Sequence, residues 1–299
     1  MRIPDTKLDE LHELGYFVLE GFLTSEEVSA ARAGLWLEFP RPEQYFDDPA
    51  AFDELRGGQF AGLRLGPWAS WDLNRLAFHP DLVDFAERFL GSADLRLYKM
   101  ELWAKYAGAV DYDQVHHRDF GNHSLVVPQR SARPSQMTSF ILLSDVGEDD
   151  GPTKVVPLEA SEAIAMWPNR LPPGELSTIE RSVTGPAGSL FTYRTDVLHR
   201  GSQMTGAAAS RFVLLADYEV WGPRWTGKMA WPDRALSSRW VDMIERATPR
   251  ERELFGFPAP GDPYWDPQTL RDVQSRYPAM NMTPYRERPR KVADSSQPL

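Results

Sequence analysis

Residues 94–220 break into short apolar runs separated by turns that contain Gly and Pro, and this pattern restricts the fold more than any other feature. Apolar and polar residues alternate from Leu95 to Trp103 and from Met137 to Leu143, which is the period of a half-buried strand. Two further strands are predicted at Ser189–Tyr193 and Arg211–Tyr218, and the second has the strongest strand pattern in the chain. Several short strands with such turns predict an all-β sandwich or barrel.

The first 93 residues predict helices around a short strand, together with a covering loop. Gly15–Leu19 suits a buried strand, and Thr24 to Glu27 has the form of a capping box at the start of a helix. A second helix is predicted from Pro80, where a missing N–H costs nothing, to Gly91. Between them, residues 40–78 form a long connection rich in aromatic residues, and connections of this length are usually lids or binding loops. We interpret it as a cover, and we expect the helices to pack outside the barrel.

After Val220 the sequence predicts helices again, near residues 233–247 and 266–276. Large aromatic residues occur throughout this part, namely Trp221, Trp225, Trp231, Trp240 and Trp265. Such side chains need a surface to bury against, so residues 221–284 are expected to pack on the barrel as an extension. Residues 285–299 are expected to form a loose tail. The prediction is therefore one domain over residues 1–299, with the barrel at its centre.

The composition excludes several classes of protein. The absence of Cys rules out disulfides, thiolate zinc sites, iron–sulfur clusters and cysteine nucleophiles. The net charge of −10 argues against a protein that binds nucleic acid through its phosphates. No apolar run approaches the roughly 20 residues of a membrane span, and the first residues lack the apolar stretch of a signal peptide. We expect a cytoplasmic protein with no nucleic-acid or membrane partner.

The residues that could bind a metal lie in the predicted barrel. His117 and Asp119 are two positions apart, so in a strand their side chains would share one face, while His116 and Arg118 would point the other way. An imidazole and a carboxylate side by side are two members of a 2-His-1-carboxylate triad, which leaves open positions on a non-haem Fe(II). His199 is the only histidine after His123, and it is the candidate for the third member.

An arginine follows this histidine at the start of the strongest strand. Arg211 comes twelve residues after His199. A guanidinium that enters a buried strand is costly unless it meets an anion, and its planar fork suits a carboxylate. The sequence therefore predicts an anion-binding position close to the candidate metal site.

Simpler explanations exist for each histidine. An H-x-D triplet occurs by chance in many proteins, and His116 and His123 could be surface residues. His79, which precedes a helix-starting proline, and His12, in a polar helix, are expected to be structural. It is the combination of H-x-D in a β region, one distal histidine and a following strand arginine that favours a metal site.

At this point the chain resembles the phytanoyl-CoA dioxygenase family of Fe(II)/2-oxoglutarate-dependent oxygenases, over residues 8–220. The opening residues 14–28, with Gly-Tyr-Phe-Val and then Leu-Thr-Ser-Glu-Glu-Val, are similar to the N-terminal signature of that family. His117-Arg118-Asp119 matches its H-x-D, and residues 150–157 resemble its Asn-Gly…Pro segment. The order of the Gly-Ser-Leu-Phe run at 188–191, the distal histidine and the strand arginine is also that of the family.

The resemblance implies a double-stranded β-helix (a cupin-like jelly roll) with flanking helices, and iron at one open end. It implies that His117, Asp119 and His199 bind Fe(II), that O2 reacts there, and that Arg211 with Ser202 holds the far carboxylate of 2-oxoglutarate. Two further residues, Thr138 and Phe140, correspond to positions that line the cosubstrate pocket in relatives. The implied activity is hydroxylation of a small-molecule metabolite, with succinate and carbon dioxide as co-products.

The sequence departs from the family pattern at one loop and leaves other functions open. Residues 157–161 read Pro-Leu-Glu-Ala-Ser where relatives usually have Pro-Gly-Ser-His, and retention of Asp119 argues against halogenation. A different metal-dependent enzyme on a similar barrel, such as an isomerase or hydrolase without 2-oxoglutarate, would not need Arg211. A non-catalytic ligand-binding member would not need all three ligand positions filled. Neither the substrate nor the oligomeric state follows from the sequence.

Overall fold

The computed structural model describes residues 2–109, 113–120, 133–166, 170–172, 174–220, 237–263, 265 and 267–286. The chain divides into two compact units, one ending at residue 229 and the other beginning at residue 230. Each unit is described by itself.

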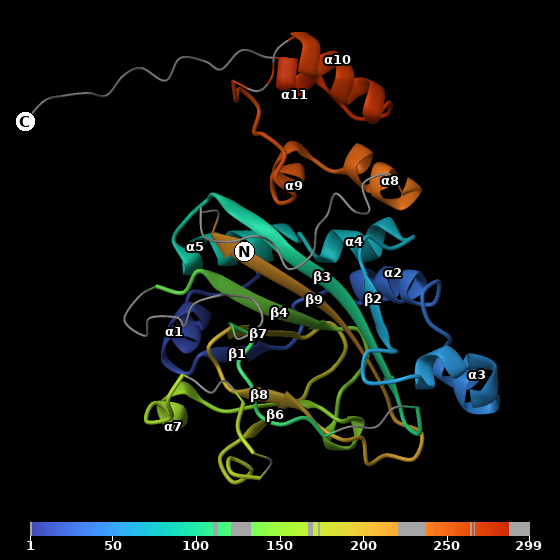
Figure 1. The fold of residues 1–299 in the computed structure, drawn as a ribbon, viewed down its shortest axis with the longest axis vertical. Helices are drawn as coiled ribbons and strands as arrows, with labels where there is room; N and C mark the ends of the chain where they lie inside the picture. Colours follow the sequence, from blue (N-terminus) through green and yellow to red (C-terminus); the bar gives the residue numbers. More distant parts are fainter. Residues whose placement is uncertain are drawn as a thin grey trace, which may run out of the picture. The chain divides into compact units, whose positions relative to one another are not determined.

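The first unit contains two antiparallel sheets (Figure 1). The larger sheet has, in spatial order, β1 (Tyr16–Leu19), β7 (Leu190–Arg194), β4 (Gln136–Leu142), β9 (Ser210–Val220), β3 (Leu95–Tyr106) and β2 (Leu63–Leu65). The smaller sheet has the order β6 (Arg181–Val183), β5 (Thr153–Val155) and β8 (His199–Gly201). Every paired strand within these sheets is antiparallel. The predicted fold class, mainly β with flanking helices, is confirmed.

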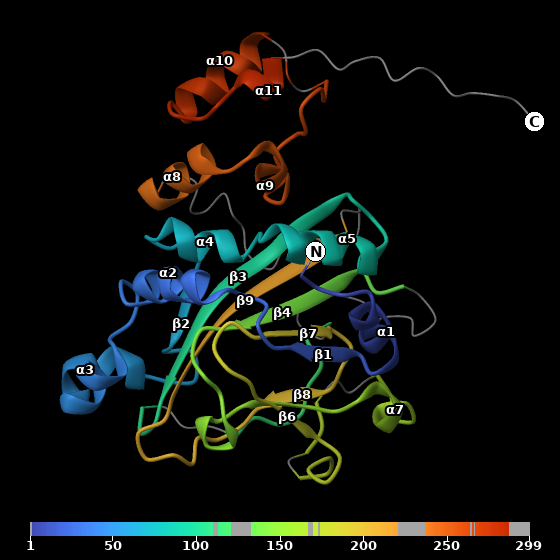
Figure 2. The ribbon, with the colours of Figure 1, turned by 180° about the vertical axis from the view of Figure 1, so that it is seen from behind.

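Helices cover one face of the larger sheet. The longer ones are α1 (Thr6–Glu13), α2 (Ser25–Leu35) and α5 (Pro80–Leu90), and a short one is α4 (Trp71–Leu76), whereas the short helix α7 (Leu158–Ser161) lies near the smaller sheet. Figure 2 shows α2, α4 and α5 lying across the strands β3, β9 and β4. Contacts confirm this arrangement: the Trp36 and Phe212 ring centroids are 5.1 Å apart, and the Tyr218 hydroxyl donates to the Ala77 carbonyl oxygen at 2.7 Å.

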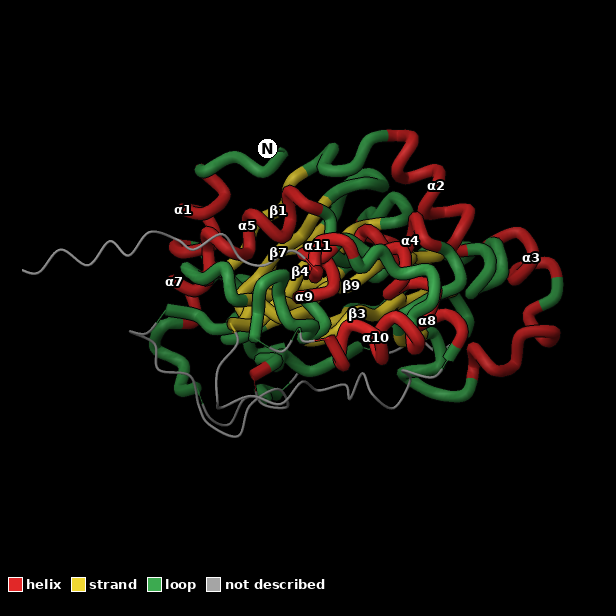
Figure 3. Tube along the Cα trace, turned by 90° about the horizontal axis from the view of Figure 1, so that it is seen from above, coloured by secondary structure: helices red, strands yellow, loops and turns green. Residues whose placement is uncertain are grey.

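Both predicted helix starts in this unit are confirmed. Thr24 caps α2 through a capping box with Glu27. Pro80 opens α5, and Gly91 ends it in the left-handed conformation at φ 68°. Viewed from above, α1, α2 and α3 lie at the periphery of the strands (Figure 3).

The segment 40–78, predicted as a long loop, contains secondary structure. It forms α3 (Pro42–Asp47), the 3₁₀ helix η1 (Pro49–Arg56), strand β2 and helix α4. β2 pairs with β3, with Leu63 opposite Trp103, and so extends the larger sheet by one edge strand. These elements are three to eight residues long, which is too short for a hydrophobic period to show in the sequence.

The face of the larger sheet opposite the helices carries charged residues. Phe212 and Tyr218 of β9 contact the helical layer, so Arg211 and Asp217, at alternate positions, share the inward face. Directly opposite residues in a ladder lie on the same face, and Asp217 is opposite Lys99 of β3 and Thr138 of β4. This inward face, between the two sheets, is where the candidate site lies.

The second unit is helical. It comprises α8 (Ser238–Arg246), α9 (Pro249–Glu253), α10 (Pro267–Arg276) and α11 (Thr283–Arg286). Arg252 is buried and donates to the carbonyl oxygens of Ile244 and Glu245, at 2.8 and 3.1 Å. The helices predicted near 233–247 and 266–276 are confirmed where the structure describes them. Tyr285, predicted to begin a loose tail, instead lies in α11 and is buried.

Other predictions for this region lie outside the described residues, namely those for Trp221, Trp225, Trp231 and residues 287–299. Packing of residues 221–284 on the barrel stays a prediction. In the described parts of the chain, none of the helices combines the length and apolar character that a membrane-spanning segment needs.

Candidate metal centre

The structure brings three of the predicted site residues together. One ligand atom from each of His117, Asp119 and His199 can be chosen so that all three lie within 4.8 Å of one another. Asp119 Oδ1 is 3.8 Å from His117 Nε2 and 3.5 Å from His199 Nε2. His199 is buried, whereas His117 and Asp119 are partly exposed. The three donors therefore converge on a point that solvent or a small molecule can approach.

Backbone pairing places the two imidazoles side by side. His117 and His199 form an antiparallel bridge, with N–H···O distances of 2.9 and 3.0 Å in the two directions. Directly opposite residues point to the same face, and the ring centroids are 4.5 Å apart. His117 makes an isolated bridge rather than belonging to a regular strand. His117 and Asp119, which were predicted to share one face of a strand, therefore lie in an extended segment that pairs with β8 through His117.

The hydrogen bonds of the histidines fix which nitrogen is available. Nδ1 of His117 lies 3.0 Å from the Val115 carbonyl oxygen, and Nδ1 of His199 lies 3.1 Å from that of Val197. A carbonyl oxygen can only accept, so Nδ1 of each ring is the donor, and Nε2 is the nitrogen that faces Asp119 Oδ1. Burial lowers the pKa of His199 to about 4, so its imidazole is neutral at neutral pH. The Nε2 atoms of two imidazoles and one carboxylate oxygen are a set of donors that fits a divalent iron.

The two carboxylate oxygens of Asp119 have different partners. Oδ1 faces both histidines, while Oδ2 accepts a hydrogen bond of 2.7 Å from the Tyr193 hydroxyl. Tyr193 belongs to β7 and is 1% exposed. Burial, and then the charge of Asp119, raise the pKa of Tyr193 well above its usual range, so the hydroxyl remains a donor.

An ion network holds the residues next to the histidines. His116 and Arg200 point away from the site, as the alternation predicts, and both bind Glu180. Nε2 of His116 lies 2.7 Å from Glu180 Oε2, and Arg200 donates twice to the same carboxylate at 2.8 Å. Burial would raise the pKa of Glu180, but the hydrogen bonds from Arg200 and the charge of His116 lower it. Glu180 thus links His116 and Arg200, which are the residues next to the two candidate histidine ligands.

We expect Glu180→Gln to lower the free energy of unfolding by roughly 1–3 kcal/mol, because Arg200 and His116 lose a largely buried anionic partner. Glu175→Gln is the control, since Glu175 precedes it in the same segment and is exposed. Urea denaturation of both variants measures the difference. Equal stabilities of the two variants would show that the network does not hold this segment.

Arg211 lies on the inward face, at the far end of the smaller sheet. Its guanidinium donates to the Gly151 carbonyl oxygen. In β5 and β8, Val155 pairs with His199, and Gly151 is four residues before Val155, a span of about 13 Å in extended chain. An arginine side chain and a short dicarboxylate could bridge that span. Gly151 has φ 61°, and a Cβ there would lie 2.8 Å from the Ser202 carbonyl oxygen, which explains the glycine.

The other predicted cosubstrate residues differ in their environments. The Ser202 hydroxyl is buried and donates to the Pro152 carbonyl oxygen at 2.6 Å, so in this conformation its proton is already used. Thr138 is buried on the inward face and donates to Asp217. Phe140 lies two residues further along β4, with its ring centroid 5.6 Å from that of Tyr193. The structure thus places Thr138 and Phe140 beside the residues that surround the candidate metal centre.

Sequence reasoning missed a group of buried charged residues on this face. Lys99 Nζ lies 3.6 Å from Glu101 Oε2 and 3.6 Å from Asp217 Oδ2, and all three residues are at most 5% exposed. Burial raises the pKa of Asp217 to about 7, against the opposing attraction of Lys99. Burial alone would lower the pKa of Lys99, but Asp217 and Glu101 together raise it. The sequence does contain a sign of this group, because charged residues stand at alternate positions of two strands that are otherwise apolar.

Between about pH 4 and 6.5, the titration of His199 and the titration of Asp217 are expected to change the free energy of unfolding in opposite directions. The unfolded chain gains a proton at His199 that the folded protein does not, so this residue makes stability rise with pH. The folded protein keeps a proton at Asp217 that the unfolded chain has lost, so this residue makes stability fall as pH rises towards about 7.

Relative to wild type, the unfolding free energy of Asp217→Asn should therefore increase with pH, and that of His199→Gln should decrease, each by at most about 1.4 kcal/mol per pH unit. Denaturation of the metal-free proteins across this range measures both differences. If the unfolding free energies of both variants depended on pH as that of the wild type does, the pKa directions assigned to His199 and Asp217 would be wrong.

The remaining histidines behave as predicted where they are described. His79 caps α5 by accepting from the Asp81 N–H at 3.3 Å, and its ring lies 4.9 Å from that of Phe22. His12 packs on Phe89, with ring centroids 4.8 Å apart. Both are structural. His123 lies outside the described residues.

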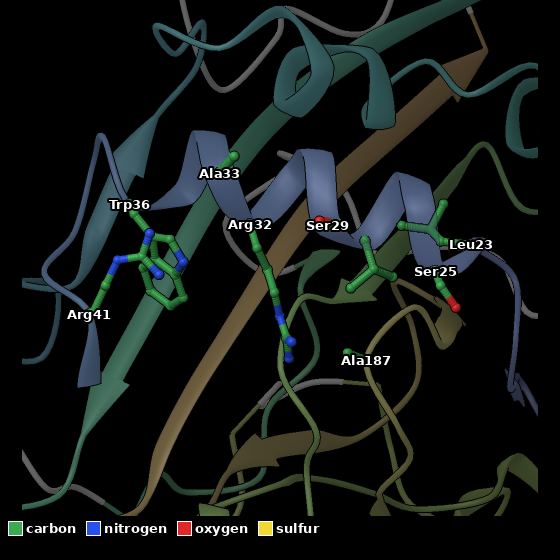
Figure 4. Close-up of a pocket in the computed structure, with 9 residues that line it drawn as sticks. Leu23, Ser25, Ser29, Arg32, Ala33, Trp36, Arg41 and Ala187 are labelled. Carbon is green, nitrogen blue, oxygen red and sulfur yellow. The ribbon is translucent and has the colours of Figure 1, made fainter. Parts of the chain in front are cut away.

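A groove of about 630 Å³ runs along the outer side of α2. Figure 4 shows Arg32 extending from this helix toward Ala187, and Arg41 beside the Trp36 ring. The Arg32 Nε atom donates to the Leu143 carbonyl oxygen at 2.7 Å, and the Arg41 guanidinium is 5.4 Å from the Trp36 ring centroid. Its lining contains no His, Asp or Glu, so it does not offer the ligands of a metal centre.

Two antiparallel sheets with flanking helices, enclosing two histidines and a carboxylate, place the chain among the jelly-roll, metal-dependent oxygenases. The sequence matches the phytanoyl-CoA dioxygenase (PhyH) family over residues 11–213, and the protein belongs to this family. It is an Fe(II)/2-oxoglutarate-dependent enzyme that uses O2, as the resemblance implied. No curated protein matches the sequence.

Several solved structures share the fold. SnoN, a non-haem α-ketoglutarate-dependent epimerase from nogalamycin biosynthesis, was crystallised with Fe3+, α-ketoglutarate and nogalamycin RO. It is 20% identical, with a TM-score of 0.55 over 78% of this chain and 90% of SnoN. HygX from Streptomyces hygroscopicus, with nickel, 2-oxoglutarate and hygromycin B bound, is 16% identical, with a TM-score of 0.53 over 75% of this chain and 90% of HygX. At these identities the similarity establishes the fold alone.

Proposed function

We propose that this protein hydroxylates a small-molecule metabolite, and that His117, Asp119 and His199 hold its iron. The observation that carries the proposal is the convergence of three donors: Asp119 Oδ1 lies 3.8 Å from His117 Nε2 and 3.5 Å from His199 Nε2, on a side of the site that is partly exposed. Three protein ligands leave positions open for a cosubstrate and oxygen. When bound, iron would activate O2, so that one oxygen atom oxidises 2-oxoglutarate to succinate and carbon dioxide and the other hydroxylates the substrate.

The chain's own residues bind and orient the cosubstrate. Arg211 is the anchor for the far carboxylate, by charge-assisted hydrogen bonds that its fork can make in pairs. Thr138 and Phe140 line the pocket, and Ser202 is the second donor once its hydroxyl turns from Pro152. The position of Arg211 on the inward face, within reach of the smaller sheet, supports this assignment. A metal-dependent isomerase or hydrolase that does not use 2-oxoglutarate would have no use for this arginine.

A small molecule is the substrate class that the surroundings favour. Phe140, Trp103 and Leu215 share the inward face with Lys99 and Asp217, so apolar and polar contacts are both available. Two proteins with this fold were crystallised with small molecules, nogalamycin RO and hygromycin B. SnoN is an epimerase, so the experiment must distinguish hydroxylation from an oxidation that leaves the substrate mass unchanged.

The test is turnover of 2-oxoglutarate labelled at its first carbon, with Fe(II), air and pools of small metabolites. Release of labelled carbon dioxide above the substrate-free rate identifies a reactive pool. With ¹⁸O2, incorporation of one labelled oxygen atom into the product supports hydroxylation, and a product of unchanged mass contradicts it. Activity that persists in His117→Ala would overturn the assignment of the ligands.

A further inference from the structure

A continuous series of side-chain contacts runs from Asp119 into the larger sheet. The Tyr193 hydroxyl donates to Asp119 Oδ2 at 2.7 Å, and Thr138 is the residue directly opposite Tyr193 in the ladder, so their side chains lie beside one another on the same face. Thr138 donates to Asp217, and Asp217 pairs with Lys99 at 3.6 Å. The series therefore links three strands, β7, β4 and β9, to β3.

The series continues along β3. Lys99 also pairs with Glu101 at 3.6 Å, and Glu101 accepts from the Trp103 Nε1–H at 3.0 Å. Burying these charges is costly unless each has a partner, and here each charge has an opposite charge beside it. The network holds Thr138 in place, and the Tyr193 side chain beside it is 1% exposed, so the ring that carries the hydroxyl has little room to move.

The position of that hydroxyl decides how Asp119 can bind a metal. A carboxylate can bind through one oxygen or through both. Oδ1 faces the two histidines, whereas Oδ2 is held by Tyr193 on the other side of the group. Binding through both oxygens would make Oδ2 share its electron density between the metal and the Tyr193 proton, which disfavours it, and would occupy one more coordination position. Cosubstrate and oxygen together need all the positions that three protein ligands leave open.

We propose that Tyr193, held by the buried Thr138–Asp217–Lys99 network, is a positioning residue that restricts Asp119 to binding metal through Oδ1 alone. The inference rests on the proposed metal site. It assigns a function to a tyrosine and to a set of buried charges that the ligand triad itself does not explain. Outer partners of ligating side chains typically contribute 10- to 100-fold to metal affinity.

Tyr193→Phe tests this inference, because it removes only the hydroxyl and keeps the ring that stacks on Phe191 at 5.1 Å. Tyr218→Phe is the matched control: Tyr218 is equally buried, and its hydroxyl bonds a backbone carbonyl oxygen in the helical layer. Calorimetric titration of each metal-free protein with Co(II), and the visible spectrum of the Co(II) form, are the measurements.

We expect Tyr193→Phe to bind Co(II) about 10-fold or more weakly and to have a changed ligand-field spectrum, while Tyr218→Phe matches wild type. Thr138→Val is a second, isosteric variant and should weaken binding in the same direction. If Tyr193→Phe and Thr138→Val both bind as wild type does, the inference is wrong and the metal site stands. If the wild-type protein binds no Co(II), the proposed metal site itself fails.

Discussion

Replacement of His199 with alanine is expected to abolish Fe(II) binding and to reduce turnover of 2-oxoglutarate by at least about 1,000-fold. The remaining pair, His117 and Asp119, are neighbours in one segment and offer only two donors, with no third group to complete a face of the metal. His199 also pairs with His117 through two backbone hydrogen bonds, which the substitution leaves in place. The loss should therefore come from the missing nitrogen and not from a rearranged backbone.

The control for this variant is His12→Gln, which changes a histidine that packs on Phe89 in the helical layer. Anaerobic titration with Fe(II) and the yield of succinate measure the two effects. His12→Gln should match the wild-type protein in both. Normal iron affinity in folded His199→Ala would remove His199 from the ligand set and leave the candidate centre without its third member.

Arg211→Met has the second-largest expected effect, and it should weaken the binding of 2-oxoglutarate without weakening the binding of Fe(II). Removing one partner of a desolvated charge pair typically costs about 2–5 kcal/mol, so the Kd for 2-oxoglutarate should rise by roughly 30-fold or more. Affinity for Fe(II) should be unchanged, because the guanidinium of Arg211 donates to the carbonyl oxygen of Gly151, which is four residues before the β5 partner of His199. Arg211→Lys should recover part of the affinity, since a lysine keeps the charge but loses the planar fork.

Arg32→Met is the matched control, since Arg32 lies on α2 in the outer groove (Figure 4). Titration of the iron-loaded variants with 2-oxoglutarate separates the two positions. A normal Kd in Arg211→Met, or an equal loss in Arg32→Met, would refute the assignment of the anchor.

Much of the barrel was predictable because its strands have clear patterns. The four strands predicted within residues 94–220 all occur, as do the capping box at Thr24 and the αL glycine at Gly91. These features depend on local alternation and on cap chemistry, which are visible in a single segment. The short elements within residues 40–78 were missed because three to eight residues are too few to show a period.

The candidate ligands could be predicted from the sequence, but the residues that surround them could not. His117 and Asp119 belong to a recognisable H-x-D triplet, and His199 follows in the order of a family that the chain resembles. Tyr193 and Asp217 have no such signal. They reach the site because β7, β4 and β9 pair in one register, and the register between strands far apart in sequence cannot be read from their individual patterns.

The most direct test of the account is the visible spectrum on adding Fe(II) and then 2-oxoglutarate to the metal-free protein without oxygen. Binding of 2-oxoglutarate to iron through two oxygens gives a weak metal-to-ligand charge-transfer band. The account predicts that this band appears in the wild-type protein, is absent in His199→Ala, and in Arg211→Met requires much higher 2-oxoglutarate. Iron binding without any band at saturating 2-oxoglutarate would contradict it.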